Sequence, residues 1–168
     1  MPGVAARAWR GNRADGRVDP SGRGKAGSPV GEAVDDNRGM LLRLHHAATI
    51  CSDYEVSRRF YTQVLGLRVI AEHFREARRS WKLDLGLPDG SQVELFSFEG
   101  APPRPSYPEA RGLRHLAFAV ADVAAAKARL EAHGVTVEDI RMDEYTGRRF
   151  TFFADPDDLP LEFYEDPA

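Results

Sequence analysis

The octapeptides HAATICSD (residues 46–53) and HLAFAVAD (residues 115–122) follow one pattern, and this pattern decides the fold. Each begins with a histidine and ends with an aspartate seven residues later, and a short apolar run lies between them. Each aspartate precedes a helical pattern of about a dozen residues, in which apolar side chains recur at helical spacing. Gly66 and Gly134 are the expected stops of the two helices. Two such copies predict a duplicated structural unit.

Strand-like runs follow each helical pattern. In the first copy they are residues 67–74, 81–87 and 92–98, and in the second copy residues 135–140, 149–154 and 159–165. Ser52 and Glu55 also match S-x-x-E, the capping box that begins many helices. We therefore expect an α+β fold of two tandem β-α-β-β-β modules, whose strands form a curved mixed sheet around a cavity.

The expected domain spans residues 40–168, with modules at 42–98 and 113–166 joined by the Pro-rich loop 99–112. Residues 1–39 differ in composition, since they hold 8 Gly and 3 Pro and no Leu, Ile, Phe or Tyr. Their 7 basic and 5 acidic residues give a net charge of +2. We expect this segment to be a disordered tail, or a translation start misassigned upstream of Met40.

Overall composition excludes several classes of protein. The 168 residues carry a formal net charge of −3, which argues against a strongly basic nucleic-acid binder. We expect no membrane span, because no stretch approaches the length of about 20 apolar residues that one requires. The single cysteine, Cys51, excludes an intrachain disulfide, and we expect a cytoplasmic protein.

Two histidines and two glutamates carry the chemical signal. His46 begins the first module and His115 the second, while Glu94 and Glu162 lie in the last predicted strand of each. Their separations are 48 residues in the first module and 47 in the second. One strand glutamate alone is usually solvated and one histidine alone is more often part of a core. The same spacing twice predicts instead that all four converge on a divalent cation such as Zn, Ni, Co, Mn or Fe(II).

These octapeptides, together with VELF (93–96), GLRHLAFAV (112–120) and DPDDLPLEFYE (155–165), resemble the glyoxalase I or vicinal oxygen chelate superfamily over about residues 42–166. The stretches SWKLDL (80–85), RPSYPEARGLRHLAF (104–118) and YTGRRFTFF (145–153) look most like its YaeR-like group of glyoxalase-like metalloproteins. The resemblance implies His46, Glu94, His115 and Glu162 as the ligands of one divalent ion, with Ni or Zn favoured and Co, Mn or Fe as alternatives.

The same resemblance implies lyase and isomerase chemistry through a metal-stabilised enediolate, on a small α-hydroxycarbonyl or hemithioacetal substrate. Glu162 is the expected catalytic base and Glu94 the second candidate. The sequence departs from bacterial glyoxalase I at Ile50 and Phe98, where that enzyme has an Arg and an Asn toward glutathione. The resemblance therefore supports the metal and the reaction type more than it supports glutathione as a co-substrate.

Arg75, Trp81, Lys82 and Arg149 are the candidate substrate-binding residues, and such a cationic and aromatic wall would suit a small anionic molecule. We expect a homodimer, because several members of the superfamily dimerise and some share modules between chains. Two alternatives stay open at this point. One is a metalloprotein of the same superfamily with epimerase or dioxygenase chemistry, and the other is a metal-containing small-molecule binder without catalysis.

Overall fold

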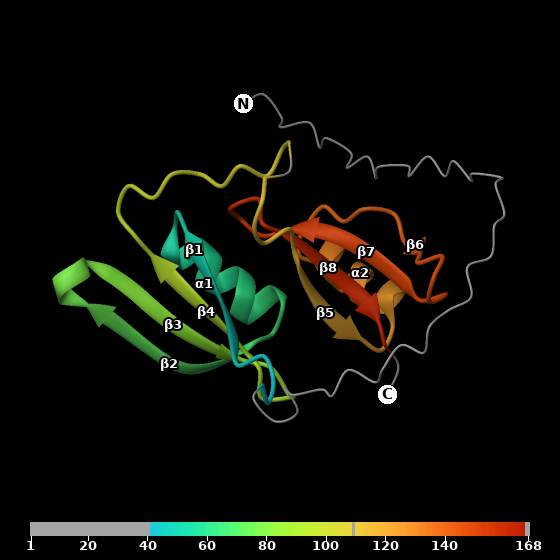
Figure 1. Ribbon diagram of the computed structural model, residues 1–168, viewed down its shortest axis with the longest axis horizontal. Coiled ribbons are helices and arrows are strands. Elements are labelled where there is room, and N and C mark those ends of the chain that lie inside the picture. Colours follow the sequence, from blue (N-terminus) through green and yellow to red (C-terminus); the bar gives the residue numbers. More distant parts are fainter. Residues whose placement is uncertain (1–40, 109, 167–168) are drawn as a thin grey trace, which may run out of the picture. The chain divides into compact units, whose positions relative to one another are not determined.

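The computed structural model describes residues 41–108 and 110–166, so the expectations for residues 1–39 lie outside the described part. Two modules follow one another along the chain (Figure 1). The first contains β1 (His46–Cys51), α1 (Tyr54–Arg59), the π-helical turn η1 (Phe60–Val64), β2 (Arg68–Arg75), the 3-10 turn η2 (Glu76–Arg78), β3 (Ser80–Gly86) and β4 (Gln92–Ser97). The second contains β5 (Leu116–Val120), α2 (Val123–Ala132), β6 (Arg141–Met142), β7 (Arg149–Ala154) and β8 (Pro160–Glu165).

Each module forms a four-stranded mixed sheet of the same topology. Sheet A has the strand order β1-β4-β3-β2 and sheet B the order β5-β8-β7-β6. The first strand of each module runs parallel to the last one, and the remaining pairs are antiparallel. This arrangement confirms the predicted α+β class and the repeated β-α-β-β-β order.

Aspartates begin both helices. The Asp53 side chain accepts a hydrogen bond from the Val56 amide, and the Asp122 side chain accepts from the amides of Ala124 and Ala125. Ser52, which the capping-box pattern predicted as the N-cap, lies one residue too early. Its amide instead donates to the Asp157 carboxylate at 3.1 Å.

The first strand-like run after the helix of the second module was predicted at the wrong place. Residues 135–140 form no ladder, apart from an isolated bridge between Val137 and Phe153, and the strand that pairs with β7 is the short β6. Val135, Val137 and Ile140 pack against the core instead. The β-branched residues of 135–140 are therefore those of a buried loop, and they do not indicate a strand.

Alternation along the strands gives each sheet one buried face and one open face. Leu83, Leu85, Val93 and Leu95 of sheet A are buried among the core side chains, as are Phe153, Leu161 and Phe163 of sheet B. We call the opposite side of each sheet its open face. It carries the residues at the alternate strand positions, such as Lys82, Glu94 and Glu162.

The turn between β7 and β8 is bonded to the first module. The hydroxyl of Tyr61, which is fully buried, donates to the Asp155 carboxylate at 2.9 Å. None of the helices in residues 41–108 and 110–166 has the length and apolar character needed to cross a bilayer.

Candidate metal and substrate site

His46 and Glu94 lie beside each other on the open face of sheet A. The distance from His46 Nε2 to Glu94 Oε2 is 3.7 Å, and the Glu94 side chain is only 14% exposed. His46 Nδ1 lies 2.9 Å from Nδ1 of His45, so the second ring nitrogen is oriented by a neighbour. A partner on the other nitrogen fixes the orientation of a metal-binding histidine, although that partner is more often a carboxylate, a backbone carbonyl or water.

Lys82 is the counter-ion of the Glu94 carboxylate. Its ammonium group lies 3.1 Å from Glu94 Oε1 and also bonds Asp84, which is paired with Glu94 across β3 and β4. These contacts raise the pKa of Lys82 against the opposing effect of its own burial, which is the largest single influence. Glu94 therefore has one oxygen toward a lysine and the other toward a histidine.

His115 and Glu162 form the corresponding pair on the open face of sheet B. Nε2 of His115 lies 3.0 Å from Oε2 of Glu162, whose side chain is 11% exposed. Burial raises the pKa of Glu162, while the charges of His115 and Arg141 act in the opposite direction. The His115 ring also packs edge-on against Phe152, with the ring centroids 5.2 Å apart.

The two pairs occupy equivalent positions in their modules. Each glutamate lies opposite an alanine of the neighbouring parallel strand, Ala48 for Glu94 and Ala117 for Glu162. Each of these alanines follows the histidine of its module by two residues. The small side chain leaves the carboxylate uncovered by its strand neighbour, which suits a carboxylate that binds something beyond the sheet.

The four predicted ligands do not form one cluster within a single chain. In residues 41–108 and 110–166, no three side chains of histidine, cysteine, aspartate or glutamate come together as a group that could hold a metal. The structure brings His46 to Glu94 and His115 to Glu162, and it leaves them as two separate pairs.

Arg75 lies on the open face of sheet A, as expected for a candidate substrate-binding residue. Its guanidinium stacks over the rings of Phe96 and Phe98, at 4.8 and 5.3 Å from their centroids, and bonds the Ser80 hydroxyl. Within the described residues it makes no ion pair with an acidic side chain. Arg75 therefore offers a positive charge close to aromatic surface.

Sequence reasoning missed the equivalent arginine of the second module, Arg141. Its guanidinium lies over Phe150 and Phe152, at 5.0 and 5.3 Å from the ring centroids, and it pairs with Glu138 at 2.8 Å. The detectable signal was the F-x-F pattern in the strand, because residues two apart share one face of a sheet. Each open face thus combines a His–Glu pair with an arginine stacked on two phenylalanines.

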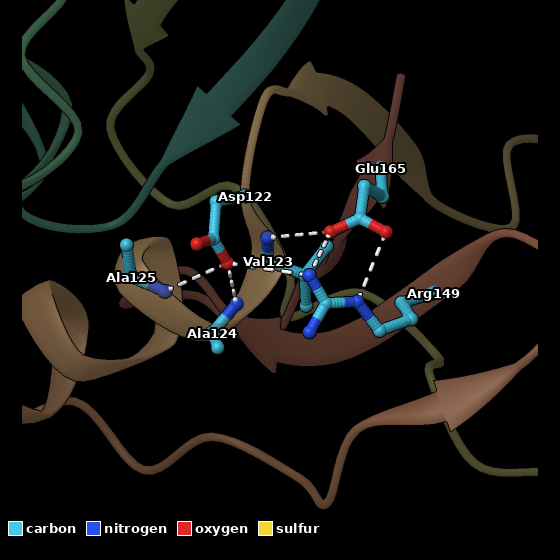
Figure 2. A network of polar contacts seen from close by, with 6 residues as sticks. All are labelled: Asp122, Val123, Ala124, Ala125, Arg149 and Glu165. Carbon is cyan, nitrogen blue, oxygen red and sulfur yellow. Dashed lines mark hydrogen bonds and ion pairs between the residues drawn. The ribbon is translucent and has the colours of Figure 1, made fainter. Parts of the chain in front are cut away.

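Trp81 and Arg149, the other two candidates, lie on the helix sides of their sheets. Trp81 stacks on Tyr54 of α1 with the ring centroids 5.0 Å apart. Arg149 bonds the Glu165 carboxylate and lies 3.5 Å from Asp122, the residue that begins α2 (Figure 2). In this network Arg149 joins the end of β8 to the start of the helix, so its contacts are structural ones.

The donor set suits a divalent cation. Two imidazoles and two carboxylates offer two neutral and two anionic ligands, which would balance a charge of +2. The buried Nδ1 of His115 has no hydrogen-bond partner among the described residues. His115 therefore lacks the partner that orients the His46 ring, and its own ring is held by Phe152 and Glu162.

Comparisons with known proteins agree with the resemblance expected from the motifs. Residues 43–163 match the model of the Glyoxalase/Bleomycin resistance protein/Dioxygenase superfamily. The protein YaeR of Escherichia coli (strain K12) is 58% identical over 125 residues, which are 74% of this chain and 97% of YaeR. The 2-epi-5-epi-valiolone epimerase of an Actinomyces species is 32% identical over 148 residues, covering 76% of this chain and 81% of the epimerase. A solved glyoxalase family protein from Enterococcus faecalis is 43% identical, with a TM-score of 0.70 and coverage of 75% and 99%.

Proposed function

Since the chain belongs to the Glyoxalase/Bleomycin resistance protein/Dioxygenase superfamily, we propose that it is a metalloenzyme with glyoxalase-I-like lyase or isomerase activity. In this proposal His46, Glu94, His115 and Glu162 together hold one divalent cation. The observation that carries it is the repetition of one His–Glu pair, at 3.7 Å on sheet A and at 3.0 Å on sheet B, at equivalent positions on two open faces.

The two pairs meet between two copies of the chain. No three candidate ligands group together within the described part of one chain, whereas the donor chemistry asks for all four. A symmetric homodimer solves this, because the open face of sheet A in one protomer can face sheet B of its partner, and the two-fold axis then creates two equal sites.

A divalent ion in this site would supply Lewis-acid chemistry, stabilising negative charge that develops on two neighbouring substrate oxygens. Ni and Zn are the ions we favour, with Co, Mn and Fe as alternatives, since nitrogen and oxygen donors accept all of them. The residues of the chain then have to hold the substrate and move a proton between its adjacent carbons.

The neighbours of the two glutamates suggest different roles for them. Glu94 has Lys82 as a counter-ion, which stabilises its ionised form and fixes one of its oxygens. Among the described residues Glu162 has no lysine beside it; it contacts His115, and the charge of Arg141 favours its ionised form. We therefore assign Glu162 as the base that removes a proton from one carbon and returns it to the next, and Glu94 as the fixed ligand.

The surroundings of the site favour a small anionic substrate over a glutathione adduct. Arg75 presents a positive charge on the open face without an acidic partner among the described residues. Ile50 is 51% exposed on the same face, and Phe98 lies under Arg75. Apolar side chains at these two positions cannot donate hydrogen bonds to a peptide-like cofactor.

We place this activity in the cytoplasm. Cys51 is the single cysteine of the chain and is buried as a free thiol. A protein of this composition needs no oxidising compartment for its stability.

Metal content of the full-length chain tests the proposal. We expect about one equivalent of divalent metal per chain by elemental analysis, lost in His46→Ala and in His115→Ala. It should be retained in His133→Ala, whose histidine is the C-cap of α2. Turnover of hemithioacetals and small α-hydroxycarbonyl compounds by the loaded protein should disappear in Glu162→Gln. Absence of metal after loading with Ni, Zn, Mn or Fe(II) would exclude the site.

Epimerisation is the second candidate, and the 32% identical Actinomyces epimerase favours it specifically. Glu162 would then remove the proton from one face of the carbon, and a second acid, for which Glu94 is the candidate, would donate a proton to the same carbon from the opposite face. Exchange of substrate hydrogen with solvent deuterium, without conversion to a different constitutional isomer, would identify this chemistry.

A further inference from the structure

A cavity of about 660 Å³ lies on the helix side of sheet B, and none of the four proposed metal ligands lines it. Its wall is mainly apolar, with Phe118, Phe163 and Leu130 from the second module and the segment 64–67 and Leu87 from the first. The volume is in the range of small-molecule sites, which is about 300–1,000 Å³. The cavity is therefore large enough for a ligand with an apolar body.

Among residues 41–108 and 110–166, two arginines are the only charged residues that line this cavity. They are Arg68, at the start of β2, and Arg129 of α2, and no aspartate or glutamate lies in the wall. Within residues 41–108 and 110–166, neither arginine makes an ion pair with an acidic side chain. The wall thus has a net charge of +2 with no internal counter-charge.

Two glycines make room for the guanidinium groups. A Cβ at Gly66 would lie 3.2 Å from Nη2 of Arg129, and a Cβ at Gly86 would lie 3.3 Å from Nη2 of Arg68. Both distances are closer than ordinary contacts of a side-chain carbon. The positive groups therefore lie against backbone at the edge of an apolar hollow.

We propose that this cavity is a second, metal-independent binding site for a small amphipathic anion, such as a medium-chain carboxylate. The apolar wall would take the hydrocarbon body, because burial there removes apolar surface from water. The arginines would take the anionic head, since guanidinium groups bind carboxylates through charge-assisted hydrogen bonds. A cationic ligand would be repelled, and a neutral one would lose the polar half of the interaction.

Charge also argues against the chain's own N-terminal segment as the occupant. Residues 1–39 carry a net charge of +2 and contain no Leu, Ile, Phe or Tyr. Such a segment matches neither the apolar wall nor its positive charge. A small anion is complementary to both.

Calorimetric titration of the metal-free, full-length protein with octanoate, octanamide and octylamine tests the proposal. Octanoate should bind, octanamide should bind about tenfold more weakly, the factor expected for one charge-assisted hydrogen bond, and octylamine should not bind. Arg68→Gln and Arg129→Gln should each weaken octanoate binding about tenfold and leave octanamide binding unchanged. Arg78→Gln, which changes an exposed arginine of η2 outside the cavity, is the matched control and should have no effect.

A second variant guards against a merely structural effect of the arginine changes. Ala125→Trp should fill the cavity from α2 and abolish octanoate binding without touching either arginine. His115→Ala should bind octanoate like the wild type, so failure of the metal proposal would not affect this one. Absence of octanoate binding, equal affinity for octanoate and octanamide, or a loss of binding in His115→Ala would each overturn the proposal. One further outcome would overturn the proposal. If the wild type does not bind octanoate and Ala125→Trp changes the oligomeric state, the cavity is a contact between chains.

Discussion

Replacement of Tyr61 by phenylalanine should destabilise the fold by removing one hydrogen bond to a buried carboxylate. Tyr61 is fully buried and Asp155 is 6% exposed, and the tyrosine hydroxyl donates to Asp155 Oδ2 at 2.9 Å. The other oxygen, Oδ1, already accepts from the amides of Asp157 and Leu159. Phenylalanine keeps the ring and leaves Oδ2 without its donor, so we expect a loss of about 2 kcal/mol, the usual range for a bond to a charged group.

The size of this loss should depend on pH. Burial raises the pKa of Asp155, while the bonds from Leu159 and Tyr61 oppose that effect. Without the hydroxyl the pKa of the folded state rises further. A carboxyl group with a raised pKa favours folding below its unfolded pKa and loses that contribution as the pH rises through the folded pKa. The difference between wild type and Tyr61→Phe should therefore be largest at neutral pH and shrink toward about pH 4, the ordinary range of an aspartate.

Urea unfolding followed by circular dichroism, with metal-free protein at one fixed concentration, measures this difference. Tyr54→Phe is the matched control, because the Tyr54 hydroxyl bonds the Glu72 carboxylate at 2.5 Å and that carboxylate also pairs with Arg58. Its loss should be below about 1 kcal/mol, because the Glu72 side chain is 31% exposed and keeps Arg58 as a partner when the hydroxyl is removed. A Tyr61→Phe variant as stable as the wild type, or equally destabilised at both pH values, would refute the reasoning.

Three further perturbations have clear expected outcomes. Burial raises the pKa of the Cys51 thiol to about 11, so iodoacetamide should leave Cys51 unlabelled at neutral pH and label it once urea unfolds the chain. Leu130→Ala, at a residue 1% exposed, should lower the unfolding free energy by about 3 kcal/mol in the same urea assay. Lys82→Gln removes the counter-ion of Glu94. The melting temperature of the metal-free protein should therefore fall more than that of the metal-loaded protein, in which the cation also balances the Glu94 charge. Equal shifts of the two melting temperatures would argue against a metal at Glu94.

The repeated fold could be predicted because its signals are local. The Asp53 and Asp122 side chains bond the first turns of both helices, and each has an apolar strand before it. Alternation along β4 and β8 assigns Glu94 and Glu162 to the faces opposite the buried leucines. Such features depend on residues a few positions apart, so they can be recognised without the tertiary structure.

Features that depend on packing or on a second chain escaped prediction. Residues 135–140 have the composition of a strand. Val135 and Val137 are apolar because they pack against the core from a loop, not because they belong to a sheet. The stacking of Arg141 on two phenylalanines depends on how β6 pairs with β7. The sequence symmetry identified the two His–Glu pairs, but a repeat cannot reveal whether equivalent positions meet within one chain or between two.

Metal content of a defined heterodimer tests most directly the central claim, a four-ligand site shared between chains. One chain would carry His46→Ala with Glu94→Gln, the other His115→Ala with Glu162→Gln, and two affinity tags would isolate the mixed dimer. A shared site predicts one metal ion per heterodimer and none in either parent homodimer, because one of the two sites regains all four ligands. A heterodimer without metal, beside a wild-type dimer that binds two ions, would contradict the account.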